Sequence, residues 1–294
     1  MQCVLVITMN ASHALSASPE SDGIFGYLID RMPFIERVDL SVWGRRRKVP
    51  KRTVSILQHF SIGGPGRLYG HSNHGICRAT RNKFEQRFGV LQWPGRVPPL
   101  RFIFYSNGTP LTCANVQMVL DAMMRRGCRT CLSKVELTFD LTKPSVNFFR
   151  DHTVTAARKL TYIANERGRF FCSGTRNSPW QLVIYEKPPI VRFELILRRQ
   201  FLRKLRVNLP HEIVRLRTLD LRRLVRVQEP ESRNLADDNN VPGYVLPVIR
   251  NWAERFSTRK FAYALRGCGR RPDEWLRPCP VEGKIRRMQR RLVW

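Results

Sequence analysis

The fold of this chain is decided by three short runs, which read Lys134-Val-Glu-Leu-Thr-Phe-Asp-Leu141, Gln181-Leu-Val-Ile-Tyr-Glu-Lys187 and Val191-Arg-Phe-Glu-Leu-Ile-Leu-Arg198. Each run alternates an apolar residue with a polar one, which is the period of a half-buried β-strand. The runs therefore predict three strands whose apolar side chains share one face of a sheet. An antiparallel sheet can pack that face on helices and leave the other open.

The predicted open face carries more reactive groups than a solvated surface needs. Carboxylates, a tyrosine, a lysine and arginines would lie on it together, which indicates an open polar catalytic face. Its members are Glu136, Thr138, Asp140, Tyr185, Lys187, Arg192, Glu194 and Arg198.

The flanking patterns predict an α+β fold, a largely antiparallel sheet with helices packed on one face. We expect strands at Leu100–Tyr105 and Arg169–Ser173, helices at Thr112–Arg126 and Asp151–Arg167, and a strand pair within Gly23–Val42. Basic helical segments follow at Phe201–Val207, His211–Thr218 and Leu221–Val227, and a final helix at Leu246–Arg266. The predicted divisions are a leader over 1–22, an α+β domain over 23–227 with its catalytic core at 134–199, a linker over 228–245 and a basic helical tail over 246–294.

The charge balance indicates a polyanionic partner. The chain has 52 Lys and Arg against 23 Asp and Glu, a formal net charge of +29. Neutralising phosphates releases counterions and drives binding, so nucleic acid is the simplest partner. A ribosomal-type protein, a membrane-surface protein and a coding bias towards Arg are the alternatives.

The compartment is predicted to be the cytoplasm. Eight cysteines over 294 residues are too sparse for a disulfide framework. Met1–Ala17 faintly imitates a signal peptide but lacks a basic n-region, and an overlong start would explain it equally well. No run approaches the roughly 20 apolar residues of a membrane span.

Two other segments have both a functional and a purely structural interpretation. The first offers metal ligands at two places about fifty residues apart in sequence, a separation that disfavours a shared zinc site. These ligands are His71, His74, Cys77, Cys128 and Cys131. The second is a basic run that is either a phosphate-contacting loop or a solvated one, and it comprises Arg45, Arg46, Arg47 and Lys48.

Tyr185 is the candidate nucleophile. A strand tyrosine two residues before Lys187 on the same face can attack a phosphodiester and form a phosphotyrosine ester. Because a phenol has a pKa near 10, it needs a nearby cation or metal to react as an oxyanion. Lys187, Arg192 and a divalent metal are the available helpers. The alternative is a strand tyrosine that only packs on its neighbours.

The carboxylates are candidate ligands for Mg²⁺ or Mn²⁺, which prefer oxygen. Glu136 and Asp140 share a face but stand roughly 13 Å apart at ~3.3 Å per residue, so they cannot easily hold one ion together. Glu194 on a neighbouring strand can meet one of them, and we favour Glu136. The alternative is that these acids pair with Arg192 and Lys134 across strands.

These residues carry a resemblance to rolling-circle replication initiators, of both the plasmid replication-initiation-factor family and the filamentous-phage type. It rests on the ordered set Lys134–Asp140, Phe171-Cys-Ser-Gly-Thr-Arg-Asn-Ser178, Leu182-Val-Ile-Tyr-Glu-Lys187 and Val191–Leu197, about 65 residues in all. Two positions depart from the family pattern: Glu136 replaces the usual Asp, and Cys172 stands where an aromatic residue is more common.

The resemblance implies roles for individual residues. Tyr185 would be the nicking tyrosine with Lys187 beside the phosphate, and Glu136 and Glu194 would be metal-binding carboxylates. Gly174, Arg176 and Ser178 would form a substrate-facing turn, and Arg198 and Arg199 are further candidate DNA contacts.

We therefore expect an initiator that nicks and joins one strand of origin DNA through a 5′-phosphotyrosine intermediate. Expected partners are origin DNA with a hairpin or single-stranded segment, a host helicase and a polymerase, and a homodimer is a further expectation. The alternatives are a non-catalytic DNA- or RNA-binding protein and a defunct initiator that keeps the fold without the reaction.

Overall fold

The computed structural model describes residues 33–43, 75–79, 88–92, 100–106, 111–124, 129–155, 160–166, 168–231, 246–292 and 294. The predicted leader, the basic run Arg45–Lys48 and the first part of Gly23–Val42 lie outside these residues. So do His71, His74 and Cys128, and of Cys77 only the backbone is described, within a strand.

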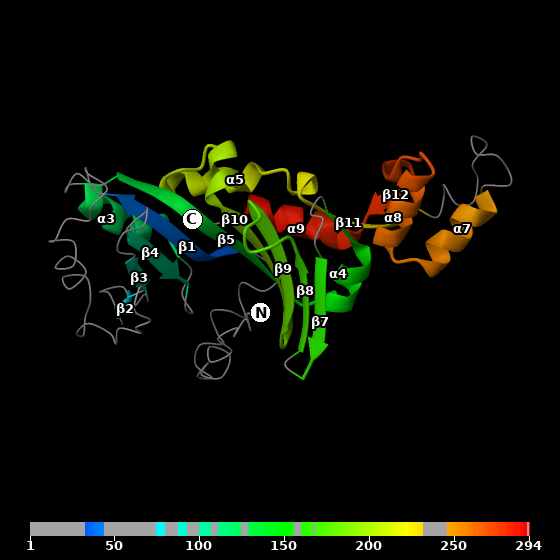
Figure 1. The fold of residues 1–294 in the computed structure, drawn as a ribbon, viewed down its shortest axis with the longest axis horizontal. Coiled ribbons are helices and arrows are strands. Elements are labelled where there is room, and N and C mark those ends of the chain that lie inside the picture. The colour runs from blue at the N-terminus through cyan, green and yellow to red at the C-terminus, as the bar shows by residue number, and fades with distance from the viewer. Residues whose placement is uncertain are drawn as a thin grey trace, which may run out of the picture.

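One large sheet forms the centre of the molecule (Figure 1). Its nine strands follow the order β2-β3-β4-β1-β5-β10-β9-β8-β7, and each neighbouring pair is antiparallel. The strands are β1 Phe34–Trp43, β2 Gly75–Ala79, β3 Phe88–Gln92, β4 Leu100–Tyr105, β5 Arg129–Leu141, β7 Leu160–Asn165, β8 Gly168–Ser173, β9 Trp180–Lys187 and β10 Ile190–Arg198.

The three alternating runs form adjacent strands at the middle of this sheet. β10 lies between β5 and β9, and Leu195 pairs with both Leu137 and Leu182. All three of these side chains are buried at 1% exposure or less. The predicted apolar face is therefore confirmed as the core-facing side of the sheet.

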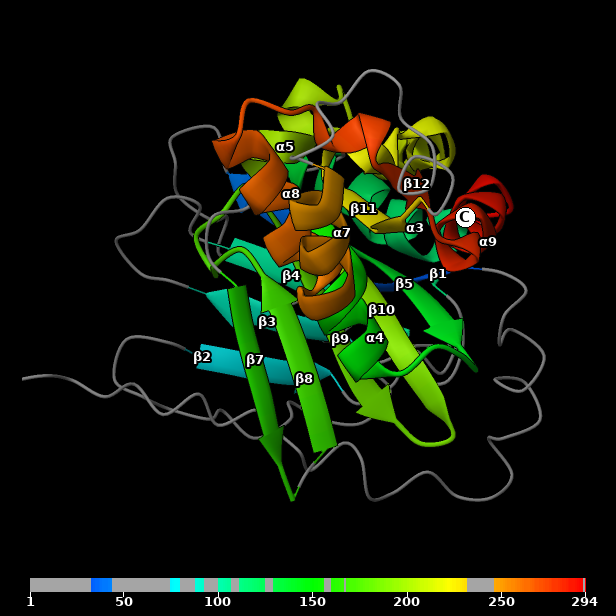
Figure 2. The ribbon, with the colours of Figure 1, turned by 90° about the vertical axis from the view of Figure 1, so that its right-hand side faces the viewer.

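A layer of helices covers that apolar face (Figure 2). Val116, Leu202 and Ile285, from three different helices, belong to the same buried cluster as Leu137 and Leu195 of the sheet. The α+β architecture is thus confirmed. The layer consists of α3 Cys113–Met124, α4 Val146–His152, α5 Arg199–Lys204, the 3-10 helices η3 Pro210–Thr218 and η4 Leu221–Arg223, and α9 Pro280–Arg290.

A smaller sheet of three strands, in the order β12-β11-β6, carries a second cluster. Phe261 and Trp275 fill this cluster and are buried at 0% and 2% exposure. Among the described residues, no helix is both long and apolar enough to cross a membrane. The elements of this part are β6 Thr153–Thr155, β11 Val225–Pro230, β12 Leu276–Pro278, α7 Leu246–Arg255, α8 Thr258–Gly267 and η5 Pro272–Glu274.

The predicted helix over Asp151–Arg167 is wrong. The helix in this region, α4, begins earlier, where the Ser145 side chain accepts a hydrogen bond from the Phe148 N–H, and it ends at His152. The chain then forms β6 and β7. The β-branched run Thr153-Val-Thr155 favours a strand, and its pairing with β11 outweighs the helical spacing of the apolar residues.

The C-terminal region also differs from the prediction. The helix expected over Leu246–Arg266 is two helices that meet at Phe256 and Ser257, and Leu221–Val227 is a short 3-10 helix followed by a strand. Residues 246–294 do not form a separate tail, because α9 packs into the main core through Ile285 and Met288. The apolar stripe of α9 lies among many arginines, which hid it in the sequence.

Candidate active site

The polar face of the sheet is organised around Arg192. The strand register places Arg192 directly opposite Asp140 on β5 and directly opposite Tyr185 on β9. Glu194, two residues along β10, lies opposite Thr138. Because directly opposed residues of antiparallel strands point to the same side, all five side chains occupy one face.

Tyr185 is hydrogen-bonded to Glu194. Its hydroxyl donates to Glu194 Oε1 at 2.7 Å. Burial raises the pKa of the Tyr185 phenol well above its ordinary value, the charge of Glu194 raises it further, and the charge of Arg192 lowers it. Tyr185 is therefore neutral at pH 7 and donates its hydrogen to the Glu194 carboxyl group.

Glu194 is an unusually basic carboxylate. The residue is only 9% exposed. Burial, followed by the charge of Glu136, raises the pKa of Glu194 to about 8, although Arg192 and the Tyr185 hydrogen bond favour its ionised form. With a pKa near 8, most Glu194 side chains carry a proton at pH 7, and the ionised fraction is a stronger base than an ordinary carboxylate.

Arg192 is fixed by a network of carboxylates. It donates to both oxygens of Asp140, at 2.7 and 2.8 Å, and to Glu36 at 3.3 Å. Ser106 donates to the same Glu36 oxygen at 3.0 Å. Burial lowers the pKa of Arg192, but the hydrogen bonds to Asp140 and the charges of Glu36 and Asp140 outweigh it and hold the pKa above its ordinary value.

Two acids of this face are paired with cationic side chains. Both oxygens of Asp140 accept hydrogen bonds from Arg192, whereas Glu136 pairs with Lys134 on its own strand. Glu136 lies opposite Ile196, so it is a diagonal neighbour of Glu194 on the same face. Within the described part of the chain, no group of three or more His, Cys, Asp or Glu is arranged to hold a metal ion.

Two carboxylates and a hydroxyl on this face are the candidate ligands for a divalent cation. Among the described residues, the buried Thr138 Oγ1 has no hydrogen-bond partner, and it lies directly opposite Glu194. The charge of Glu136 raises the pKa of Glu194, which indicates that the two carboxyl groups lie close enough to repel each other when both are ionised. Mg²⁺ is commonly held by one or two carboxylates with water and substrate phosphates, so a site of this size suffices.

Lys187 lies at the end of β9, on the same face as Tyr185 by strand alternation. Although the residue as a whole is exposed, desolvation of its ammonium group lowers the pKa of Lys187, and the charge of Arg192 lowers it further. The shift brings Lys187 closer to giving up a proton, which suits a group beside a leaving oxygen.

The predicted substrate-facing turn is a tight turn between β8 and β9. Gly174 has a φ of +93°, and a Cβ there would lie 3.1 Å from the Trp180 carbonyl oxygen. The Ser178 Oγ accepts a hydrogen bond from the Thr175 N–H at 2.9 Å, so Ser178 closes the turn. Arg176 is exposed at its tip.

The two other arginines predicted to contact DNA support the backbone. Arg198 donates to the Ser178 carbonyl at 2.9 Å and to Gln181 Oε1 at 2.6 Å. Arg199 donates to the Cys131 sulfur and to the Leu132 carbonyl. The contact with Arg199 also accounts for Cys131, the one predicted zinc ligand whose side chain is described.

Sequence reasoning missed Glu36 and Ser106, and it placed Thr138 on the polar face without giving it a role. Glu36 and Ser106 come from β1 and from the end of β4, far from the three decisive runs, and only the pairing of β1 with β5 brings Glu36 to Arg192. A usable signal was present for Thr138, a polar residue between Glu136 and Asp140 in an alternating strand.

Comparisons with known proteins give a distant likeness. No protein-family model matches the chain, and no curated protein matches it. Among solved structures, the chain is similar to the rolling circle replication initiator protein from Geobacillus stearothermophilus, with a TM-score of 0.48 and 14% sequence identity. The match covers 82% of this chain and 98% of that one. A likeness of this degree assigns no activity, so the function has to rest on the residues of the site.

Proposed function

We propose that this protein nicks and rejoins one strand of DNA through Tyr185 and thereby initiates rolling-circle replication at an origin. One observation carries the proposal: on the polar face of the sheet, the Tyr185 hydroxyl donates a hydrogen bond of 2.7 Å to Oε1 of Glu194, a carboxyl group that is only 9% exposed. A nucleophile within hydrogen-bond reach of a base, beside a fixed cation, is the arrangement required for covalent catalysis.

The reaction balances with the groups present. The Tyr185 oxygen attacks phosphorus as its proton passes to Glu194, and the bond from phosphorus to the 3′ oxygen breaks. The strand's 5′ phosphate is then esterified to tyrosine, and the 3′ oxygen leaves with a proton, for which Lys187 is the donor at hand. Because the ester keeps the energy of the broken bond, the reverse reaction rejoins the strand.

Arg192 has a positioning and electrostatic role. Its hydrogen bonds go to Asp140 and Glu36, so it is held rigidly opposite Tyr185. Its charge lowers the pKa of Tyr185 and therefore favours the phenolate that develops during attack. Asp140, in this account, orients Arg192 and does not bind metal.

Glu136, Glu194 and Thr138 would hold Mg²⁺ or Mn²⁺. When bound, the cation would polarise the scissile phosphate and offset charge in the transition state. The cation would also remove the repulsion between Glu136 and Glu194. We expect Mn²⁺ to raise the melting temperature of the wild type at pH 7.5 and to raise it much less for Glu136→Gln. An equal rise in both proteins would exclude Glu136 as a ligand.

A covalent adduct tests the proposal. The protein is incubated with a labelled single-stranded oligonucleotide and Mn²⁺, and a band shifted on a denaturing gel is the adduct. Tyr185→Phe should abolish the band while DNA binding persists. The matched control is Tyr263→Phe, since Tyr263 is 51% exposed on α8 and should not matter. An adduct that persists in Tyr185→Phe excludes Tyr185 as the nucleophile.

One observation favours the second candidate, a non-catalytic nucleic-acid-binding protein. Burial raises the pKa of the Tyr185 phenol, which makes the phenol harder to ionise than a free tyrosine. In that case the polar face would dock phosphates without reacting, and the wild type would form no adduct under any metal condition.

A further inference from the structure

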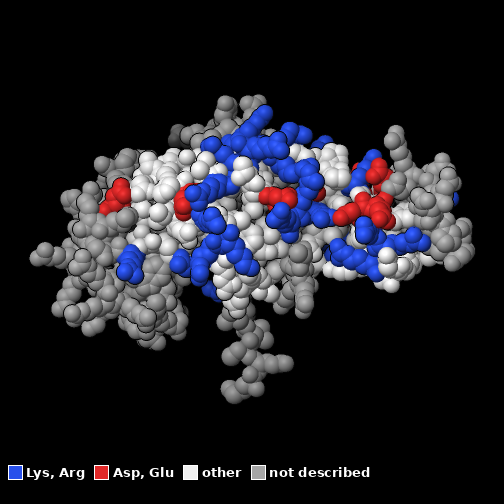
Figure 3. Space-filling view, turned by 90° about the horizontal axis from the view of Figure 1, so that it is seen from above, with Lys and Arg blue, Asp and Glu red and all other residues white. Residues whose placement is uncertain are grey.

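The helix layer carries a strong excess of positive charge on the side of the molecule away from Tyr185. Residues 199–223 contain eight Lys and Arg against two acidic residues, and residues 280–291 contain five against one. Figure 3 looks down on this layer from above Figure 1 and shows Lys and Arg side chains gathered over its middle, with few Asp and Glu among them.

The three acidic residues of these two segments have structural roles. Glu212 accepts hydrogen bonds from the N–H groups of Asn208 and Leu209, and Asp220 accepts one from the N–H of Arg222. Glu282 is 5% exposed and accepts one from the N–H of Val227. Each acid also pairs with arginine: Glu212 with Arg215, Asp220 with Arg223, and Glu282 with Arg222 and Arg286. The two segments still contain far more Lys and Arg than acids, so their net charge stays strongly positive.

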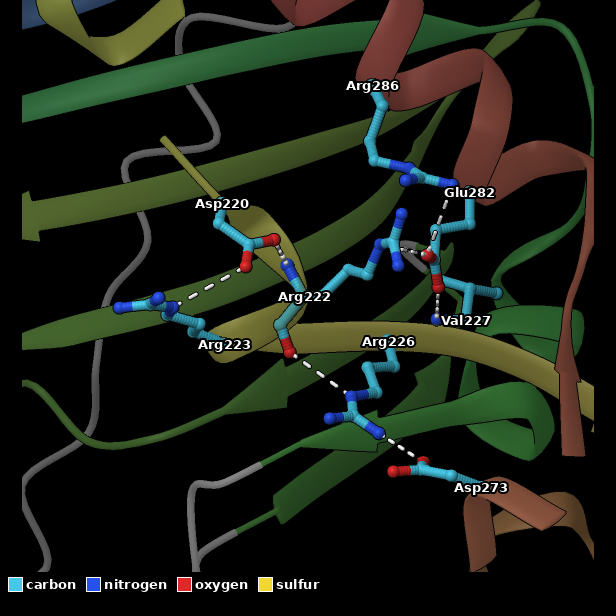
Figure 4. A network of polar contacts seen from close by, with 8 residues as sticks. All are labelled: Asp220, Arg222, Arg223, Arg226, Val227, Asp273, Glu282 and Arg286. Carbon is cyan, nitrogen blue, oxygen red and sulfur yellow. Dashed lines mark hydrogen bonds and ion pairs between the residues drawn. The ribbon is translucent and has the colours of Figure 1, made fainter. Parts of the chain in front are cut away.

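The scaffold that holds these arginines is firmly tied together. Figure 4 shows Glu282 of α9 between Arg222 and Arg286, with ion pairs of 3.7 and 3.8 Å. Gln289 of α9 donates to the carbonyls of Leu216 and Leu219, at 2.6 and 2.7 Å. The α9 and η3 segments therefore lie side by side as one rigid support.

Six exposed arginines lie on α9 and on the neighbouring segments of the helix layer. Three of them, Arg287, Arg290 and Arg291, are spaced three and four residues apart at the end of α9 and share one side of it. Arg206 adopts a φ of +57° just after α5, a conformation that favours glycine and is costly for arginine. The helix-layer arginine surface is defined as Arg203, Arg206, Arg223, Arg287, Arg290 and Arg291.

We propose that the helix-layer arginine surface binds the phosphate backbone of duplex DNA. Arginine suits phosphate because its planar fork can donate two hydrogen bonds at once. A surface for single strands would also need exposed aromatic rings on which bases stack. Of the large exposed hydrophobic side chains among the described residues, the two aromatic ones are Phe256 and Tyr263, and they lie beyond this surface, after α7 and on α8.

The position of this surface has a consequence for the reaction, and that consequence rests on the proposed function. The apolar side chains of β5, β9 and β10 face the helix layer, so Tyr185 and Glu194 face the opposite side. A duplex on the arginine surface and a strand at Tyr185 would then lie on two different faces. The DNA would have to open between them, with the strand passing around the edge of the molecule.

Duplex binding and adduct formation can be measured separately. Fluorescence anisotropy with a 30-base-pair duplex, over a series of salt concentrations, measures binding in the Tyr185→Phe background, where no covalent product forms. The test variant replaces Arg287, Arg290 and Arg291 with Ala. The matched control removes the same charge from Arg255, Arg266 and Arg271, which are exposed on or near α7 and α8. Circular dichroism establishes that both variants are folded.

The test variant should bind duplex at least roughly tenfold more weakly at 150 mM salt. Its plot of log affinity against log salt should lose up to about 2.7 in slope, at ~0.9 per phosphate contact removed. The control should keep both values within about twofold of the parent. With Tyr185 restored, the test variant should form the adduct on a single-stranded oligonucleotide at the parental rate.

Several results would overturn the proposal. Equal losses in the test and control variants would mean that net charge alone drives binding. Unchanged duplex binding in the test variant would exclude the surface. Tighter binding of a 30-base-pair RNA duplex than of the DNA duplex would assign the surface to RNA. Absence of an adduct in every variant would exclude the proposed nicking function, whereas the conclusion on duplex binding would still stand.

Discussion

Replacing Glu194 with Gln separates the two properties that the structure assigns to this residue. Gln keeps an oxygen that can accept the hydrogen bond from the Tyr185 hydroxyl, now made to Oε1 at 2.7 Å. It removes the negative charge and the capacity to take the proton. The pKa of Glu194 is raised from an ordinary value of 4.5 to about 8, chiefly by burial and then by the charge of Glu136.

The raised pKa makes stability depend on pH in a definite direction. Below pH 4.5 the carboxyl is protonated in both the folded and the unfolded chain, and its full contribution to stability is present. As pH rises from 4.5 to about 8, the unfolded chain ionises first, so stability is progressively lost. At 1.36 kcal/mol per pKa unit the loss reaches an upper limit of about 5 kcal/mol.

Urea unfolding at pH 5, 6.5 and 8.5, in EDTA, measures this effect. Glu194→Gln should match the wild type near pH 5 and exceed its free energy of unfolding by up to about 5 kcal/mol at pH 8.5. Adduct formation should fall by roughly 10²- to 10⁴-fold, the usual value of a general base. The control is Glu186→Gln, a half-exposed acid on the same strand as Tyr185 that accepts from the Arg169 N–H. If the two Glu variants show the same pH dependence, the account of Glu194 is wrong.

Two further changes test the scaffold of the site. Asp140→Asn should destabilise the protein by about 3–5 kcal/mol in urea unfolding, because Arg192 is 3% exposed and would lose its main partner. The control Asp151→Asn breaks an exposed pair with Arg150 and should cost no more than about 1 kcal/mol. Equal costs of the two substitutions would contradict the role of Asp140. Gly174→Ala should lower the free energy of unfolding by about 1–3 kcal/mol, because of the φ of +93° and the close Trp180 carbonyl. The control Gly283→Ala in α9 should be neutral or stabilising by up to about 1 kcal/mol, since its Cβ would meet only Arg287 Nη1 at 3.5 Å. A tolerated Gly174→Ala would contradict the steric argument for the turn.

The faces of β5, β9 and β10 were predictable because alternation is a local property of a strand. Simple strand geometry also separated Glu136 from Asp140 and favoured Glu136 as the partner of Glu194. That preference stays a prediction, because Arg192 occupies both oxygens of Asp140 while Glu136 is itself paired with Lys134. The identity of the metal, and whether one binds, stay predictions.

Features that depend on contacts between segments far apart in the chain were not predictable from the sequence. The position of Glu36 beside Arg192 requires β1 to pair with β5, about a hundred residues later in the chain. Thr153-Val-Thr155 becomes a strand only because β11 lies beside it. α9 looked like a basic tail because its arginines outnumber the few apolar residues that dock on the core.

The central claim is that Tyr185 itself becomes bonded to DNA. The most direct measurement is to trap the adduct on a short oligonucleotide, digest it with trypsin and nuclease, and identify the modified peptide by mass spectrometry. We predict a nucleotide linked through its 5′ phosphate to Tyr185, in the tryptic peptide that spans 177–192, because the bond between Lys187 and Pro188 resists trypsin. A nucleotide on any other residue, or a linkage through a 3′ phosphate, would contradict the account.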